Sequence, residues 1–508
     1  IADTNWRDVL SLVPLAIWND SGTIKKYPAL IFHNEATSFD ADSSIHFMQM
    51  YEPSHLTTIG SIPSNLNNLF TAAEPTGAGI SEVDIANIQP ADYFSYWSSY
   101  NSLVIVDYDN YKAGLMASVF ASHKNSPIIF VNSANLATYQ AMINGKTIYT
   151  IGNLDGVTQS YINNNAGCEI NYSLEEVQKW YSTETNSDKL ILVNPGDLEM
   201  ELNATFFPEK SFYINNLFSK MSLSAPFLAA AKQEVIAFTE LADPGSNSGC
   251  SVNATLSANI ATADADALYV IQNLFSIQPN YLTVIAWPRA IPESEYDYCN
   301  GLWQVRNSVD WKYGSTDNID FSLNVGRIYG ITVADASANI VSSIFYDTLI
   351  NNLYGGSYTG TVIALTGYDA EDKAEIVKQK TSNSGYDSIC IVEDGFDNSD
   401  CSDSSVYPYP FPDNLFQSKR FVLFEDHGLS YSWPSVFSHY IIPWFDLSYN
   451  MADACLTNSY WDGEESTISI NMIRKGAIAY YGATGITFGN ITMGLTDFYK
   501  IIKELTGT

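Results

Sequence analysis

The 508-residue sequence predicts a multi-domain α/β protein built from parallel β-sheets. Short, continuous apolar runs recur along the chain, as buried parallel strands require, because both faces of such a strand are covered. Helical stretches separate these runs at the spacing of right-handed βαβ units. Hydrophobic residues make up 46% of the chain, which is enough for large cores. At ~150 residues per domain, the length predicts about three domains.

The first domain is expected over residues 1–155. Its candidate strands are Ala29–His33, Leu56–Gly60, Leu103–Asp107, Ile128–Asn132 and Thr147–Gly152. Tyr111–His123 is predicted to be a helix, because its apolar residues are spaced by three or four. Asp107 and Asp109 follow a strand, where α/β proteins usually bind ligands. We interpret both as helix-capping residues, which is the more common role of such carboxylates.

The second domain is expected over residues 156–278, where the same order of elements restarts. The strand Lys189–Asn194 precedes the helix Ser224–Lys232, and the strand Val235–Thr239 follows. A helix over Ala261–Phe275 is expected to close this unit. Asp197 follows its first strand and is interpreted, like the two aspartates above, as a capping residue.

The third domain is expected over residues 279–508, as one mainly parallel sheet with helices on both faces. Its first strand is expected in the run YLTVIA, residues 281–286, and the run DFSLNVGRIYG, which contains Val325-Gly326-Arg327-Ile328, follows. Further strands are expected at Thr361–Thr366, Ser388–Glu393 and Phe421–Glu425. A further strand ends at Ala454-Cys455.

His427 and Cys455 follow two successive strands of this third domain. The carboxyl ends of parallel strands share one edge of a sheet, and neighbouring strands lie ~4.8 Å apart. A thiol beside an imidazole is a plausible nucleophile and acid/base pair. Gly428 lets the backbone approach a substrate closely, and its N–H is a candidate donor to an oxyanion. The alternative is a surface histidine and a small buried cysteine with no joint role.

Charge and cysteine usage narrow the class of protein. The net charge of −32 argues against nucleic acid and anionic membranes as partners. The sequence contains no run of ~20 apolar residues, so we expect no transmembrane segment. The chain begins at Ile1, which we interpret as a processed N-terminus of an exported protein. Without a CxxC motif a structural zinc site is not expected. We expect Cys390 and Cys401 to be bonded and Cys455 to be free.

Two segments resemble known families. The run SLVIVDYDNYKAGLMASVFASHKNSPIIFVN with KTIYTIGN, and then DKLILVNPGDLEM with MSLSAPFLAAAKQEVIAFTE, resemble the cell-wall-binding repeats of bacterial and archaeal surface proteins. This resemblance covers about residues 25–245. The motifs NVGRIYG, SSIFYD, EDHGLSYSW and ADACLTN occur in the order of the gingipains, cysteine peptidases of the caspase-like clan. This second resemblance covers about residues 280–488.

The gingipain resemblance implies roles for individual residues. Cys455 would be the nucleophile and His427 the general acid/base, with the N–H groups of Gly428 and Cys455 as the oxyanion hole. Asp369 would contact the substrate, although this loop has no one-to-one match to the family's basic-residue subsite. No cofactor is required. The acidic stretch 394–403 suggests calcium, as in gingipains, but lacks EF-hand spacing, so a solvated loop is the simpler interpretation.

The resemblances together predict an extracellular, cell-surface protein whose partners are polypeptide substrates or other surface-protein subunits. Asn-x-Ser/Thr sequons, such as those at Asn19 and Asn203, permit glycosylation. The alternative function is a structural subunit of a sheath, S-layer or filament, in which the peptidase fold is only a scaffold and the chain assembles with copies of itself. A third candidate is a peptidase that processes other surface proteins.

Overall fold

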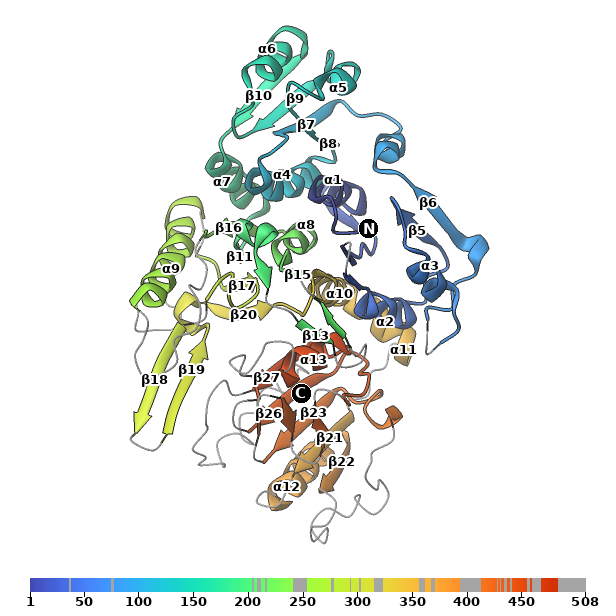
Figure 1. Cartoon of the computed structure of the whole chain (residues 1–508), viewed down its shortest axis with the longest axis vertical. Coiled ribbons are helices and arrows are strands. Elements are labelled where there is room, and N and C mark those ends of the chain that lie inside the picture. Colours follow the sequence, from blue (N-terminus) through green and yellow to red (C-terminus); the bar gives the residue numbers. More distant parts are fainter. Residues whose placement is uncertain are drawn as a thin grey trace.

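The computed structural model confirms a mixed α/β fold with several parallel sheets. Figure 1 shows the three largest sheets following one another along the long axis of the molecule. The residues that the structure describes are 1–35, 38–74, 77–202, 205–207, 212–214, 217–240, 254–275, 278–292, 294–300, 303–314, 323–355, 361–366, 371–392, 413–426, 428–429, 431–433, 436–438, 441–454, 457–458 and 467–482.

The first sheet is parallel and has the strand order β10-β9-β7-β8. Its strands are β7 (Ser102–Asp107), β8 (Ile128–Val131), β9 (Thr147–Ile151) and β10 (Cys168–Tyr172). Its connecting helices are α4 (Tyr111–Lys124), α5 (Leu136–Ile143) and α6 (Gly156–Asn165). The expected border at residue 155 falls inside this sheet. The sequence of β10 does not suggest a buried strand, because it lies at the sheet edge and its residues are exposed or half-buried.

The second sheet repeats this strand order as β16-β11-β17-β20, again all parallel. Its strands are β11 (Lys189–Val193), β16 (Val235–Phe238), β17 (Tyr281–Ile285) and β20 (Asn324–Ile328). The expected border at residue 278 therefore falls inside this sheet as well. We expected β17 and β20 in the third domain, but both pair into the sheet of β11, so residues 280–508 do not form one sheet.

The third sheet has five parallel strands in the order β22-β21-β23-β26-β27. These are β21 (Thr361–Thr366), β22 (Asp387–Val392), β23 (Phe421–Glu425), β26 (Tyr449–Asp453) and β27 (Ala479–Gly482). In all three sheets the first strand lies between the second and the third. This is the doubly wound order in which the direction of winding reverses beside the first strand. The expected parallel α/β arrangement of this region is thus confirmed from β21 onward.

The remaining elements surround these sheets. The helices are α1 (Trp6–Ala16), α2 (Asp42–Tyr51), α3 (Ser64–Thr71), α7 (Leu174–Thr185), α8 (Ala225–Lys232), α9 (Ala254–Leu274), α10 (Val333–Ile344), α11 (Tyr346–Tyr354), α12 (Glu371–Asn383) and α13 (Ile468–Arg474). The strand pairs are β1 (Ile17–Asp20) with β2 (Thr23–Lys26), β3 (His33–Glu35) with β4 (Ser38–Asp40), β5 (Leu56–Ile59) with β6 (Ile85–Ile88), β12 (Glu201–Leu202) with β15 (Leu217–Phe218), β13 (Thr205–Phe207) with β14 (Phe212–Ile214), β18 (Ser294–Asn300) with β19 (Trp303–Val309), and β24 (Ser432–Trp433) with β25 (Phe437–Ser438).

The expected strand Ala29–His33 is wrong. Phe32 forms only an isolated bridge with Ala2, and β3 begins at His33. The N–H of Ile31 donates to the Ser337 hydroxyl instead of to a neighbouring strand. The backbone of this apolar run is therefore hydrogen-bonded to Ile1, Asp3 and Ser337 and not to a full neighbouring strand.

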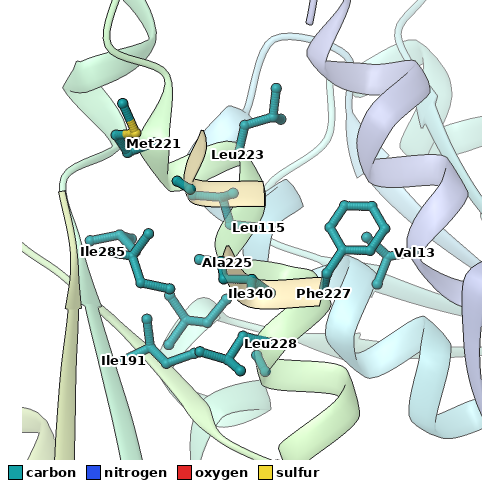
Figure 2. Close-up of a cluster of buried hydrophobic side chains, with 14 of the residues drawn as sticks. Val13, Leu115, Ile191, Met221, Leu223, Ala225, Phe227, Leu228, Ile285 and Ile340 are labelled. Atoms are coloured by element: carbon teal, nitrogen blue, oxygen red, sulfur yellow. The ribbon is translucent and has the colours of Figure 1, made fainter. Parts of the chain in front are cut away.

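A single large core joins the first two sheets. Figure 2 shows Phe227 of α8 beside Val13 of α1, with Ile191 of β11 and Ile285 of β17 on the opposite side of the same cluster and Leu115 of α4 between them. Gly114 lets α4 approach β8 and α1 closely, because a Cβ at this position would lie 2.9 Å from the Phe130 ring and 3.1 Å from Leu10. The helix α4 is buried nearly all round, as expected for a helix that packs against elements of both units.

A buried ion cluster joins the third sheet to the rest of the chain. Arg474, at the end of α13, pairs with Asp40 at 2.6 Å and with Asp335 at 2.9 Å, and all three side chains are almost fully buried. Asp42 adds a third carboxylate at 3.0 Å. Asp40 and Asp42 lie at the junction of β4 and α2, and Asp335 lies in α10, so the guanidinium connects α13 with two distant segments.

Candidate functional site

The candidate site lies at the carboxyl ends of β23 and β26. These strands are hydrogen-bonded parallel neighbours, and their register pairs Phe421 with Tyr449 and Glu425 with Asp453. The two strands therefore end at the same level of the sheet. In the sequence, His427 is two residues beyond Glu425, and Cys455 is two residues beyond Asp453. Both chain segments leave the sheet at one edge, side by side.

Three of the predicted site residues lie outside the described residues, namely His427, Cys455 and Asp369. The acidic stretch 394–403 lies outside them too. Gly428 is described and is buried. Glu425, the last residue of β23, is also buried, with 5% of its surface exposed. The structure thus describes the residues that flank His427 and Cys455 in the sequence, but not these two residues themselves.

The segment after His427 folds back on itself. Leu429 and Ser432 exchange two backbone hydrogen bonds, at 3.1 and 3.2 Å, which closes a tight turn. Trp433 then pairs with Phe437. The Trp433 ring stacks on Phe424 of β23 at 4.8 Å, with an angle of 6° between the rings. Because Trp433 is fully buried, this stack fixes the segment against the strand from which it came.

The segment around Cys455 is held from the other side. Ala454 and Thr457 are buried, and the Thr457 hydroxyl donates to the Ala454 carbonyl at 3.4 Å. Tyr480 of β27 accepts a hydrogen bond from Trp433 Nε1 at 3.2 Å and is hydrogen-bonded to the Thr457 side chain. Burial, the largest effect, raises the pKa of Tyr480 above its ordinary range, so its hydroxyl stays protonated. Sequence reasoning did not single out Tyr480, whose partners lie 47 and 23 positions earlier in the chain.

The cysteines agree in part with expectation. Cys390, fully buried in β22, is disulfide-bonded. Its expected partner, Cys401, lies outside the described residues, so that pairing stays a prediction. Cys168 is a free, exposed thiol at the start of β10.

The aspartates at the ends of the first strands of sheets one and two have structural roles. Asp107 accepts the N–H of Asp109, and Asp109 pairs with Arg7 at 3.1 Å. Asp197 is fully buried and accepts the N–H of Ser222 at 2.8 Å. Burial raises the pKa of Asp197 to about 7. The expected helix-capping role of Asp107 and Asp109 is therefore wrong, because Asn110 is the N-cap of α4. Asp197 instead accepts from the segment that leads into α8.

A second cluster of polar side chains, which the sequence did not reveal, contains Asp3, His33 and Glu35. Their ligand atoms lie within 4.8 Å of one another, a spacing that suits a metal ion. The ammonium group of Lys220 lies 2.7 Å from Glu35 and 3.3 Å from Asp3, and His33 Nδ1 lies 2.7 Å from Asp3. Lys220 already supplies a cation to both carboxylates, so the contacts are those of a buried ion-pair network.

Comparison with known proteins identifies no relative of this chain. No protein-family model, no curated protein and no solved structure matches the chain. In the part of the chain that the structure describes, no helix combines the length and the apolar character needed to cross a membrane.

Proposed function

We propose that the chain is an extracellular cysteine endopeptidase whose catalytic dyad is Cys455 and His427. The observation that carries this proposal is the register of β23 and β26. Two adjacent parallel strands end at Glu425 and Asp453, and each is followed after two residues by one member of the dyad. Strands that lie ~4.8 Å apart bring such residues within reach of each other across one sheet edge.

The chemistry follows from the residue types. The Cys455 thiolate attacks the scissile carbonyl, and His427 protonates the leaving amine. The N–H groups of Gly428 and Cys455 stabilise the oxyanion of the tetrahedral intermediate. Asp369 is proposed to contact the substrate. No metal takes part in these steps, and calcium, if bound by residues 394–403, would have a structural role.

The disulfide at Cys390 supports an extracellular or cell-surface location, because such bonds persist in oxidising compartments. The buried cluster around Arg474 supports a peptidase unit that is integrated with the other two sheets. Polypeptides, including other surface-protein subunits, are the proposed substrates.

Replacement of the nucleophile tests the proposal. With an unstructured protein as substrate, the wild-type chain should release peptides, and Cys455→Ala and His427→Ala should each lose this activity. Cys168→Ala is the matched control. It removes a free, exposed thiol in β10 of the first sheet, which is remote in sequence from Cys455, and should leave cleavage unchanged. Wild-type protein that cleaves no more than Cys455→Ala would contradict the peptidase function and favour the structural surface subunit.

A further inference from the structure

A chain of hydrogen bonds connects the two segments that carry the proposed dyad. Trp433 Nε1–H donates to the Tyr480 hydroxyl at 3.2 Å. The Thr457 side chain is a hydrogen-bonding neighbour of that hydroxyl, and both residues lie against Gly482 of β27. The Thr457 hydroxyl also donates to the Ala454 carbonyl at 3.4 Å. Trp433 belongs to the segment after His427, whereas Ala454 and Thr457 flank Cys455.

Each end of this chain is fixed independently. Trp433 stacks on Phe424 at the end of β23, and neither ring has solvent-exposed surface. Thr457 is fully buried and lies over Gly482 of β27, where an added Cβ would come within 2.7 Å of the Thr457 hydroxyl. Gly482 thus leaves the space that Thr457 occupies. Tyr480 is the only member that contacts both ends, and it stands on β27, the strand next to β26.

We propose that Tyr480 is a positioning residue, which holds the His427 segment and the Cys455 segment at a fixed separation through Trp433 and Thr457. The inference rests on the proposed peptidase function. Tyr480 acts through its neighbours and does not contact the substrate. Small displacements of reacting groups cost large factors in rate, because a productive attack needs a narrow range of geometry. Loss of one hydroxyl in this chain should therefore lower turnover more than substrate binding.

The central test is Tyr480→Phe, which removes the hydroxyl and keeps the ring. We expect kcat for peptide cleavage to fall about 10- to 100-fold with KM nearly unchanged. The rate of Cys455 alkylation by iodoacetamide should fall as well, and its pH profile should move toward that of an ordinary thiol, since the pairing with His427 is loosened. Tyr181→Phe is the matched control: it also removes a buried tyrosine hydroxyl, but one that donates to the Ala229 carbonyl. It should keep wild-type kinetics.

Thr457 provides a second, independent test if Tyr480→Phe folds poorly. Thr457→Ser keeps the hydroxyl and should retain activity, whereas Thr457→Val removes it and should reproduce the loss of kcat. The double variant Tyr480→Phe/Thr457→Val should be no slower than the worse single variant, because both remove the same connection.

If folded Tyr480→Phe and Thr457→Val both kept the wild-type kcat and alkylation rate, the positioning role would be wrong. The proposed peptidase function would be unaffected by that result. An inert wild-type protein would overturn both.

Discussion

Arg474 is the residue whose replacement should cost the fold most. Its guanidinium is almost fully buried and pairs with Asp40 and Asp335, which are buried too. Removing one partner of a buried ion pair typically costs about 3–5 kcal/mol, because the remaining charges keep no compensation. Arg474→Leu should therefore lower the free energy of unfolding by about that amount, measured by denaturant titration.

Lys112→Met is the control for this prediction. Lys112 pairs with Glu240 at 2.7 Å, but both side chains are largely exposed. Surface pairs contribute about 0–1 kcal/mol, so this variant should unfold close to wild type. A loss of less than about 1 kcal/mol in Arg474→Leu would show that the buried cluster does not hold the three segments together.

The sequence could identify single residues only where local context decides their role. His427, Gly428 and Cys455 are visible because they follow apolar runs with the spacing of strand ends. Arg474, Lys220 and Tyr480 are not visible, because each obtains its role from partners in distant segments. The carboxylates around Arg474, for example, lie 139 and more than 400 positions away.

Between elements, Asp197 fixes the turn after β11 to the start of α8. Its carboxyl accepts from the backbone and hydroxyl of Ser222, whose hydroxyl also hydrogen-bonds with Tyr111 of α4 at 2.8 Å. Burial raises the pKa of Asp197 to about 7, so the folded protein favours the protonated carboxyl. The resulting stability is complete below the ordinary pKa, near pH 4, and is lost as the pH rises through 7.

This linkage predicts that the contribution of Asp197 to the free energy of unfolding falls by about 2 kcal/mol as the pH rises from 5.5 to 7.5. Asp197→Asn cannot titrate, so the variant should lose that part of the pH dependence. Glu82→Gln, at an exposed position, is the control and should leave the dependence unchanged. Thermal unfolding at a series of pH values measures all three proteins. Identical slopes for wild type and Asp197→Asn would refute the assignment.

Most strands of the three sheets could be predicted as elements, because buried parallel strands are continuous apolar runs. β7, β8, β9, β11, β21 and β23 lie within a residue of their expected bounds. The sequence also indicates the apolar runs at β17 and β20, but it does not show which sheet these strands join. Nothing in an apolar run specifies its neighbour, since pairing depends on contacts across long stretches of chain. Edge strands such as β10 were missed because they are half-exposed.

At the scale of the whole molecule, the three sheets share one strand order around their first strand. In such sheets, ligands bind beyond the carboxyl ends of the strands, near the point where the winding reverses. In the second sheet, Asn194 and Arg327 bind the backbone of the segment 286–291 after β17. That segment crosses the carboxyl edge of the sheet. In the third sheet, the adjacent strands β23 and β26 end side by side, two residues before His427 and Cys455 in the sequence.

The proposed peptidase requires that His427 activates Cys455, and the free thiol of Cys168 serves as a reference in the same chain. A peptidyl thiol-directed probe, applied to the intact protein and located by mass spectrometry, compares Cys455 with the free, exposed Cys168. We predict that Cys455 is labelled at least about 100-fold faster than Cys168, and that His427→Ala removes this advantage. Labelling of Cys455 no faster than Cys168, or equally fast without His427, would contradict the account.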